Sequence, residues 1–355
     1  MSSRILIPGG AGFVGSSLAI GLKKLHPDWQ IICLDNLRRR GSELNLPRFK
    51  AAGVEFMHGD VRSTDDLDPQ VLNVDIIIDC SADPSVLAGF SSPQYILNTN
   101  LVGTINLLEL ARKTQAGLLF LSTSRVYSIE PLSTLNIVEH DTRLELETGQ
   151  TTLGASTKGI TEDFPLDSYR SLYGTTKLAS ELLIAEYRHS YGLKAVINRC
   201  GILTGPWQMG KVDQGVVVLW MAAHYFKKSL KYIGYGGSGK QVRDFLHIRD
   251  LLRLVDYQLT NFDRCDGDVL NVGGGRFSNL SLLEMTHLCE EITGNKIPIE
   301  PVAVERTGDI PIYITDCDRI YQKTQWKPEI KPEKTFNDIY NWIVVNEENL
   351  RPIMA

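Results

Sequence analysis

The N-terminal stretch constrains the fold of this chain more than any other. An apolar run at residues 4–7 leads into the glycine-rich turn 8–15, and an amphipathic segment follows at residues 16–24. In this order of strand, turn and helix, glycines without Cβ atoms let backbone N–H groups and the positive helix end approach a pyrophosphate. The spacing predicts these cofactor-binding residues: Gly9, Gly12, Phe13, Val14 and Gly15. The alternative is a tight glycine turn that holds no ligand.

The second predicted strand sets the choice of dinucleotide. Residues 30–34 form an apolar run that ends in Asp35, twenty residues after Gly15. An acid at this place holds the ribose hydroxyls of NAD and repels the 2′-phosphate of NADP, so Asp35 and the following Asn36 are predicted to bind NAD. Residues 38–40 are three arginines, which could accept that phosphate or form a solvated loop. With the acid in place we favour NAD and a solvated loop.

Further apolar runs continue the alternation of strands and helices. Strands are predicted at residues 54–59, 74–80, 117–121 and 195–200, and a long helix is predicted at residues 95–111. This pattern predicts an α/β fold with a Rossmann doubly wound parallel sheet, whose ligand site lies at the carboxyl ends of the strands. The residues predicted to line the cofactor there are Asp60, Val61, Ser81, Ala82 and Asn100. For Asn100, a buried amide bonded to a neighbouring loop is an equal alternative.

A predicted helix beyond residue 172 carries the catalytic hypothesis. Tyr173 and Lys177 stand at i and i+4, so they project from one helix face, roughly 5–6 Å apart at Cβ. An ammonium group at that distance favours the phenolate, and we expect the pKa of Tyr173 to fall from about 10 toward working pH. Thr123 follows the strand at residues 117–121 and could bond the same substrate hydroxyl. The alternatives are a solvated helix face for the pair and a turn-forming hydroxyl for Thr123.

The composition is that of an ordinary globular protein and excludes several partners. A chain of 355 residues favours two packed domains. Its net charge of −5 gives no reason to expect a nucleic acid or an anionic membrane as partner. The apolar runs are too short to cross a bilayer, and no signal-peptide segment precedes the first strand. The six cysteines lack paired spacing, so we expect no metal site, no disulfides and a reduced, cytoplasmic protein.

The alternation of strand and helix loosens in the second half of the chain, which suggests a substrate domain. Residues 1–202, with a return segment at 247–274, are predicted to form the NAD-binding Rossmann domain. A smaller, mixed C-terminal substrate domain is predicted from residues 203–246 and 275–355. The polar, irregular segment 128–168 is long for a loop and is interpreted as part of the substrate mouth.

Taken together, these motifs resemble the extended short-chain dehydrogenase/reductase family. The matching features are the glycine turn, Asp35, Asp60-Val61, Asn100-x-x-Gly103-Thr104-x-Asn106-Leu107, Ser122-Thr123 and Tyr173-x-x-x-Lys177. The nucleotide-sugar epimerases and dehydratases of that family share this order across nearly the whole chain. The resemblance implies bound NAD, a nucleotide-diphosphate sugar as substrate, and Thr123, Tyr173 and Lys177 as the catalytic group. It also implies a homodimer or homotetramer.

Within that family the chain looks most like the epimerases that invert C2 of a CDP-hexose, the CDP-paratose and CDP-tyvelose type. The features that carry this resemblance are Asp35-Asn-Leu before basic residues, Val-Asp-Gln-Gly-Val at 212–216, Gly-Lys-Gln-Val-Arg-Asp-x-Leu-His at 239–247, and Asn-Val-Gly-Gly at 271–274 with Asn-Leu-Ser-Leu-Leu at 279–283. By the same resemblance Arg243 and Arg306 would hold the substrate diphosphate, a task suited to a guanidinium fork. Ser124 and Gln214 would contact the remainder of the substrate.

Departures from the family pattern narrow the reaction. Ser124-Arg125 stands where the 4,6-dehydratases of the family place an Asp-Glu pair, so dehydration lacks its own acid and base. Residues 79–82 read Asp-Cys-Ser-Ala where the family commonly has His-x-Ala-Ala, and Ile202 sits where many relatives carry a substrate-facing Asn. We therefore predict a redox-neutral NAD-dependent epimerase that works through a transient keto sugar. The alternatives are a UDP-sugar 4-epimerase, a net NAD(P)-dependent nucleotide-sugar reductase, and a catalytically silent dinucleotide-binding scaffold.

Overall fold

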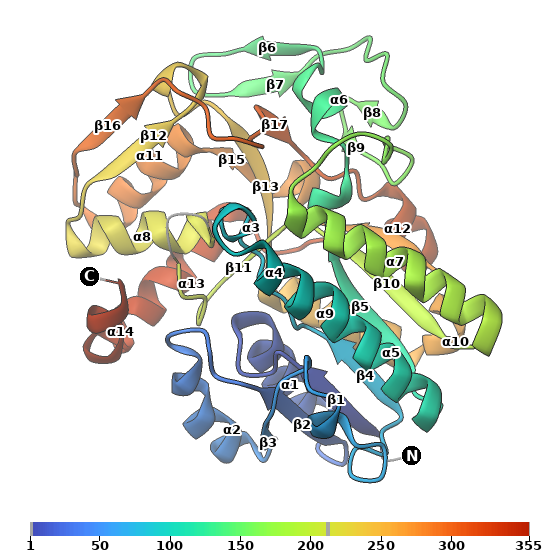
Figure 1. The fold of residues 1–355 in the computed structure, drawn as a ribbon. Helices are drawn as coiled ribbons and strands as arrows, with labels where there is room; N and C mark the ends of the chain where they lie inside the picture. Colours follow the sequence, from blue (N-terminus) through green and yellow to red (C-terminus); the bar gives the residue numbers. More distant parts are fainter. Residues whose placement is uncertain (1–2, 211–213, 355) are drawn as a thin grey trace. The chain divides into compact units, whose positions relative to one another are not determined.

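The computed structural model describes residues 3–210 and 214–354. Its largest sheet is parallel and has seven strands, five of them from the first half of the chain (Figure 1). In their order across the sheet the strands are β14 (Val269–Val272), β10 (Ala195–Cys200), β5 (Gly117–Thr123), β4 (Ile76–Asp79), β1 (Arg4–Pro8), β2 (Gln30–Asp35) and β3 (Glu55–His58). The chain winds outward from β1 in both directions, because β2 pairs with one edge of β1 and β4 with the other. The predicted Rossmann fold, doubly wound around a parallel sheet, is confirmed.

Helices cover both faces of this sheet. On one face, α5 (Gly103–Thr114) and α7 (Leu172–Tyr191) pack against each other and against β5, and Figure 1 shows them running side by side. On the other face, α1 (Phe13–Leu25) packs against β1 and β2. Gly21 of α1 contacts Leu252 of α9 (Ile248–Thr260) closely: a Cβ on Gly21 would lie only 2.3 Å from Leu252 Cδ2. A sheet buried on both sides explains why its strands are continuous apolar runs.

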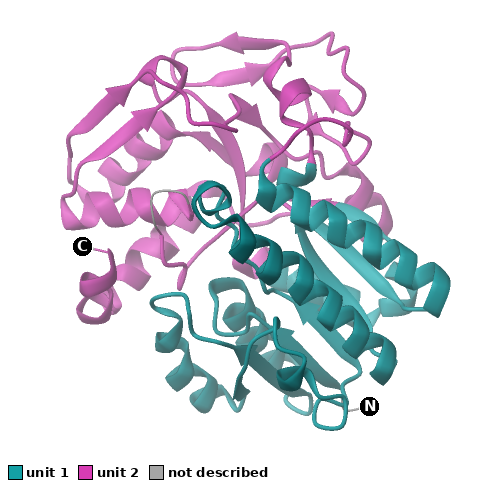
Figure 2. Ribbon diagram, viewed as in Figure 1, with its two compact units in different colours: residues 1–126, 171–199, 251–270 teal, residues 127–170, 200–250, 271–355 magenta. Residues whose placement is uncertain are grey.

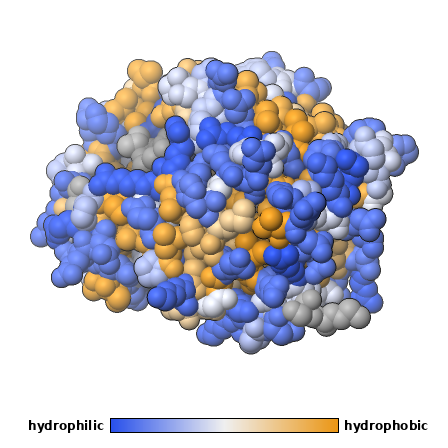
Figure 3. All heavy atoms as spheres, turned by 60° about the horizontal axis from the view of Figure 1, so that its bottom comes forward, coloured by the Kyte–Doolittle hydropathy of each residue, from blue (hydrophilic) through white to orange (hydrophobic). Residues whose placement is uncertain are grey.

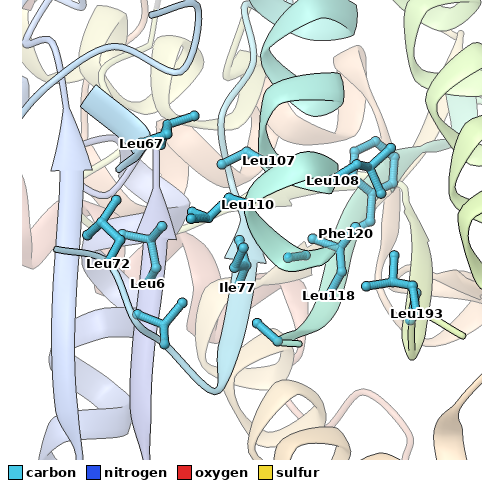
Figure 4. Close-up of a cluster of buried hydrophobic side chains, with 14 of the residues drawn as sticks. Leu6, Leu67, Leu72, Ile77, Leu107, Leu108, Leu110, Leu118, Phe120 and Leu193 are labelled. Carbon is cyan, nitrogen blue, oxygen red and sulfur yellow. The ribbon is translucent and has the colours of Figure 1, made fainter. Parts of the chain in front are cut away.

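The main hydrophobic core of this region lies between the sheet and the helices α5 and α7 (Figure 4). Leu6, Ile77 and Leu118 come from three neighbouring strands and are fully buried. Leu107 of α5 and Ile184 of α7 meet them from the helix side. Each such side chain stabilises the fold by roughly 1.5–3 kcal/mol relative to an exposed one. The core therefore fixes where α7 lies on the sheet.

The helix predicted at residues 95–111 is interrupted. It consists of α4 (Pro93–Ile96), a π-helical segment (Leu97–Val102) and α5. The π-helical segment contains the buried Asn100, whose side chain bonds the loop after β4 instead of facing solvent. Such segments are rare and are frequent at functional sites. Sequence spacing alone does not distinguish the two kinds of helical turn.

The chain divides into two compact units, coloured separately in Figure 2. Unit 1 contains residues 1–126, 171–199 and 251–270, and unit 2 contains residues 127–170, 200–250 and 271–355. The division differs from the domain boundaries expected from the sequence. Residues 127–170 belong to unit 2, and the chain enters unit 2 within β10 and again within β14.

Unit 2 is built on smaller sheets. Its four-stranded sheet is mixed: β13 (Val242–His247) pairs in parallel with β11 (Ile202–Thr204) and β17 (Ile312–Tyr313), and antiparallel with β15 (Asn279–Ser281). Three two-stranded sheets are β12 (Leu230–Ile233) with β16 (Ile299–Val302), β6 (Ile137–Glu139) with β7 (Leu144–Leu146), and β8 (Ala155–Ser156) with β9 (Gly159–Ile160). The helices of unit 2 are α6 (Ile129–Ser133), α8 (Val216–Phe226), α11 (Leu282–Thr293), α12 (Asp318–Thr324), α13 (Pro332–Val345) and α14 (Glu347–Met354). The segment predicted as irregular, 128–168, thus holds α6 and two hairpins whose strands are too short to show a period.

The surface seen in Figure 3 carries hydrophilic side chains around a central group of apolar ones. Across residues 3–210 and 214–354, no helix is both long enough and apolar enough to span a lipid bilayer. All six cysteines lie in the described part of the chain, and none of them forms a disulfide there. Burial raises the pKa of the Cys33 thiol and that of the Cys289 thiol, so both side chains act as small apolar groups.

Candidate active site

The turn between β1 and α1 has the shape that a dinucleotide pyrophosphate needs. Gly9 has φ of 71°, and a Cβ there would lie 2.6 Å from the Cys80 carbonyl oxygen. A Cβ on Gly15 would lie 2.4 Å from the Gly9 carbonyl oxygen. Gly12 is the N-cap of α1, which begins at Phe13, and as a glycine it has no side chain that could cap the first turn. The amides of a first turn and the positive helix end suit an anion, and pyrophosphate binding at this turn stays a prediction.

Asp35 is fixed beside this turn at the end of β2. Its two carboxylate oxygens accept hydrogen bonds from the N–H of Ala11 at 3.0 Å and from the N–H of Leu37 at 2.8 Å. Burial raises the pKa of Asp35, and the backbone donors oppose that rise. An ionised carboxylate offers about four acceptor positions, so lone pairs remain for ribose hydroxyls. The geometry fits the predicted role of this acid toward NAD.

The segment after β3 continues the same edge of the sheet. Asn36 Nδ2 donates to Asp60 Oδ2 at 2.8 Å, and Arg62 Nε donates to Asp60 Oδ1 at 2.9 Å. The bonds from Arg62 hold the pKa of Asp60 well below its usual range, although partial burial opposes them. Asn106 of α5 donates to the Val61 carbonyl oxygen at 2.9 Å, which anchors the next residue. A hollow of about 460 Å³ opens here, lined by Asp60, Arg62, Ser63, Asn98 and Val102.

The loop after β4 is held by a buried carboxylate where the family commonly has histidine. Asp79 Oδ1 accepts from the N–H of Ser81 at 2.9 Å and also from its hydroxyl, and Asp79 Oδ2 accepts from Thr104 at 3.2 Å. Asn100 brackets the same loop: it accepts from the Asp83 N–H at 2.8 Å and donates to the Asp83 carbonyl oxygen at 3.1 Å. Asn100 therefore has the loop-bonding role that was one of its two predicted interpretations. Ser81 and Ala82 lie in this anchored loop, beside the glycine turn.

The predicted catalytic residues lie on two elements of unit 1 that pack together. α7 packs against β5, which ends at Thr123, and against the helical turn Ser124–Val126. Tyr173 and Lys177 follow the N-cap Ser171, whose hydroxyl accepts from the Gly174 N–H at 3.2 Å. Both side chains are buried, with 9% and 2% of their surface exposed. A lysine this deeply buried is not the solvated helix face of the alternative interpretation.

The Lys177 ammonium contacts an aromatic ring of β5. Its Nζ lies 4.3 Å from the centroid of the Phe120 ring, a distance typical of a cation–π contact. Phe120 belongs to β5, three residues before Thr123. The Thr123 hydroxyl accepts from the Arg125 N–H at 3.2 Å, so the hydroxyl proton is free to point elsewhere. Ser124 occupies the first position of the turn that follows.

A buried network beside these residues was not predicted from the sequence. Glu181, one helical turn after Lys177, accepts from the hydroxyl of Ser122 and forms an ion pair with Arg199 of β10 at 2.7 Å. The side chains of Glu181 and Arg199 are only 6% and 8% exposed. The network joins α7, β5 and β10. Glu181 is at i+4 from Lys177, which is a sequence signal, but its partner Arg199 cannot be identified without the fold.

The predicted substrate residues lie in unit 2. Arg243 of β13 pairs with Asp309 at 2.8 Å, and its guanidinium also donates to the backbone carbonyl oxygens of Pro311 and Ile310. The Asp309 N–H in turn donates to the Arg306 carbonyl oxygen at 3.0 Å, so the two predicted phosphate-binding arginines are joined through one turn. Gln214 lies directly before the N-cap of α8, Gly215. Val212 and Asp213, which contributed to the resemblance, lie outside the described residues.

A metal centre was not predicted, and residues 3–210 and 214–354 hold no group of three histidine, cysteine or carboxylate side chains placed to bind a metal ion. The groups predicted to carry the chemistry are the hydroxyl of Thr123, the phenol of Tyr173 and the amine of Lys177.

Known proteins resemble this chain along nearly its whole length. The profile of the family described as NAD dependent epimerase/dehydratase family matches residues 5–273. The CDP-paratose 2-epimerase of Salmonella typhi is 30% identical over 347 residues, which cover 96% of this chain and 98% of that relative. The dTDP-glucose 4,6-dehydratase of Bacillus anthracis, solved in complex with NAD, has a TM-score of 0.78 at 25% identity and covers 99% of this chain and 100% of its own. The UDP-glucuronic acid 4-epimerase of Bacillus cereus, solved with UDP-glucuronic acid and NAD, shares the fold with a TM-score of 0.79 at 22% identity, over 96% of this chain and 99% of its own.

Proposed function

Because this chain belongs to the NAD dependent epimerase/dehydratase family, we propose that it is a nucleotide-sugar epimerase that inverts one carbon without net oxidation or reduction. The observation that carries the proposal is the buried Tyr173–Lys177 pair on α7, packed against the strand that ends at Thr123. Ser124 and Arg125 follow that strand in place of the Asp-Glu pair of dehydratases. The chain therefore has groups that could move a proton at a sugar hydroxyl, but it lacks the acid and base that dehydratases use to eliminate water.

Tyr173 is proposed to take the proton of a sugar hydroxyl and later to return it. Lys177 stabilises the phenolate because an ammonium group within one helical turn favours the charged form. Thr123 accepts or donates at the same sugar oxygen and holds it toward Tyr173. The sugar carbon loses its hydrogen as hydride while its hydroxyl loses a proton, which leaves a keto group, and a C–H bond is then formed again on the opposite face of that carbon.

The cofactor would be held by the residues of unit 1. The amides at the start of α1 would bind the pyrophosphate, and Asp35 would bind the adenosine ribose. When bound, NAD⁺ accepts the hydride and gives it back, so the protein itself has to supply position and proton transfer. The loop held by Asp79 and Asn100 keeps Ser81 and Ala82 beside the glycine turn, where small side chains leave room for the dinucleotide.

The substrate is proposed to be a CDP-hexose that is inverted at C2. The support is the 30% identity to the CDP-paratose 2-epimerase over 96% of this chain, together with Ile202 at the position where many 4-epimerases place Asn. Arg243 and Arg306 would clamp the diphosphate from unit 2. The Arg243–Asp309 pair and the turn 306–309 hold these two arginines in one structural group.

The test is a substrate panel. Full-length protein is incubated with CDP-, UDP-, GDP- and dTDP-sugars, with no added cofactor, in ordinary and deuterated water, and the products are followed by NMR. The expected result is inversion at C2 of a CDP-sugar without carbon-bound deuterium. Tyr173→Phe should lower kcat at least 100-fold, the scale of one general acid–base group, and leave substrate binding intact. Gel filtration with light scattering on the same samples tests the expected homodimer or homotetramer.

Three outcomes would contradict the proposal in distinct ways. Inversion at C4 of a UDP-sugar would replace the substrate and the carbon but keep the chemistry. Stoichiometric consumption of NADH or NADPH would indicate a net reductase. Solvent deuterium on carbon would indicate enolisation in place of hydride return.

A further inference from the structure

Five residues from three segments of unit 1 form a closed circuit of contacts. The Arg38 N–H donates to Asn36 Oδ1 at 3.0 Å, and Asn36 Nδ2 donates to Asp60 Oδ2 at 2.8 Å. Asp60 accepts from Arg62 Nε at 2.9 Å. The guanidinium carbon of Arg62 lies 5.3 Å from the centroid of the Tyr95 ring, and that of Arg38 lies 4.1 Å from the same centroid. Tyr95 therefore contacts both arginines and completes the circuit.

The two arginines that contact Tyr95 differ in their partners. Arg62 is paired with the Asp60 carboxylate, so its charge is balanced within the circuit. Arg38 is an exposed residue, and its guanidinium lies over the face of the Tyr95 ring. A cation over an aromatic ring at such a distance is attracted by about 0.5–1 kcal/mol at an exposed site. Tyr95 thus restrains a guanidinium that stands only three residues after Asp35.

Asp35 and Arg38 have different partners. The Asp35 carboxylate accepts from the N–H of Ala11, in the turn after β1. The backbone of Arg38 is tied through Asn36 to Asp60, which follows β3. The Arg38 guanidinium itself lies over the Tyr95 ring, which also contacts Arg62.

An arginine just after the acid of the second strand is the residue type that accommodates the 2′-phosphate of NADP in this kind of fold. We propose that Tyr95 withholds Arg38 from that phosphate and so is a specificity-determining residue for NAD over NADP. Residues 38–40 then form more than a solvated loop, since Arg38 belongs to the wall of the dinucleotide site. This inference concerns only cofactor binding and does not depend on which sugar the enzyme uses.

The experiment measures the ratio of the two dissociation constants, NADP⁺ over NAD⁺. Full-length protein is equilibrated with defined mixtures of the two dinucleotides, separated from free ligand, denatured, and the bound dinucleotides are quantified by chromatography. Tyr95→Ala should lower the ratio about two- to five-fold, the factor that corresponds to the cation–π contact. Tyr95→Phe keeps the ring and should leave the ratio unchanged.

Two further variants separate the proposed role from a general loosening of the loop. Arg38→Ala alone should leave the ratio unchanged or raise it, and the double variant Tyr95→Ala/Arg38→Ala should lose the gain of NADP⁺ binding. Tyr95→Leu, which fills more space than alanine but has no aromatic face, should give the same fall as Tyr95→Ala even if the alanine variant is poorly folded. The proposal is overturned if the ratio stays constant in both Tyr95→Ala and Tyr95→Leu, if Tyr95→Phe behaves like them, or if removing Arg38 does not cancel the gain.

Discussion

The buried Arg199–Glu181 pair leads to a quantitative prediction about stability. Arg199 donates to the Glu181 carboxylate through Nε at 3.1 Å and through Nη2 at 2.7 Å, and Ser122 donates to the same carboxylate. With 6% of Glu181 exposed, water cannot replace a lost partner. Replacing Arg199 by Met removes the guanidinium but keeps much of the stem. A buried carboxylate left in this way without its cation typically costs 3–5 kcal/mol.

The assay is urea unfolding followed by circular dichroism, applied to the wild type and three variants. Arg199→Met is expected to lower the free energy of unfolding by about 3–5 kcal/mol. Glu181→Gln should also destabilise, because it removes the carboxylate charge that pairs with the buried arginine. The double variant removes both charges of this pair, so its loss should be smaller than the sum of the two single losses by about 2 kcal/mol or more, within the range of coupling for residues in contact.

A matched control is the exposed pair Arg112–Glu109 on α5. Its side chains are 39% and 37% exposed, so solvent screens the attraction. Arg112→Met should therefore cost much less stability than Arg199→Met. If Arg199→Met costs no more stability than Arg112→Met, or if the two single losses simply add in the double variant, the buried Arg199–Glu181 pair does not stabilise the fold as predicted.

Two further predictions concern pH and the glycine turn. Burial raises the pKa of Asp244 to about 6 and lowers the pKa of His247 to about 4. Between about pH 4 and 6, Asp244 is protonated in the native state and ionised in the unfolded chain, so Asp244 makes the stability fall as pH rises. His247 is neutral in the native state above about pH 4 but protonated in the unfolded chain up to about pH 6.5, so His247 makes the stability rise with pH. Compared with the wild type, Asp244→Asn should make the change in stability from pH 4 to 6 more positive by about 3 kcal/mol, and His247→Gln should make it more negative by about 3 kcal/mol, in urea titrations. Shifts of the same sign in the two variants would contradict the assignment. In the glycine turn, Gly15→Ala should abolish NAD binding in a titration, because the new Cβ would lie 2.4 Å from the Gly9 carbonyl oxygen. The control is Gly192→Ala: Gly192 has φ of 69° and open space around it, so this change should cost about 1–2 kcal/mol of stability and leave NAD binding intact.

Much of the fold follows from local patterns in the sequence. Strand runs, helical spacing and the glycines at 9, 12 and 15 depend on neighbours within a few residues, so the sequence predicts the parallel sheet and the order of its elements correctly. The same holds for Tyr173 and Lys177, because a spacing of four residues on a helix fixes a shared face. The catalytic and binding roles of these residues stay predictions, and NAD as cofactor is supported by the family.

Other features depend on which segments the topology brings together. Glu181 and Arg199 are 18 residues apart, and Tyr95 stands far from Arg38 and Arg62 along the chain, so no period or spacing relates them. The pairing of Arg243 with Asp309 and the π-helical turn at Asn100 are decided in the same way. A side chain's neighbours across loops and sheets are set by the packing of the whole chain. The sequence alone determined the fold class of this protein and identified its candidate reactive residues, and the tertiary structure decided which charged side chains lie beside them.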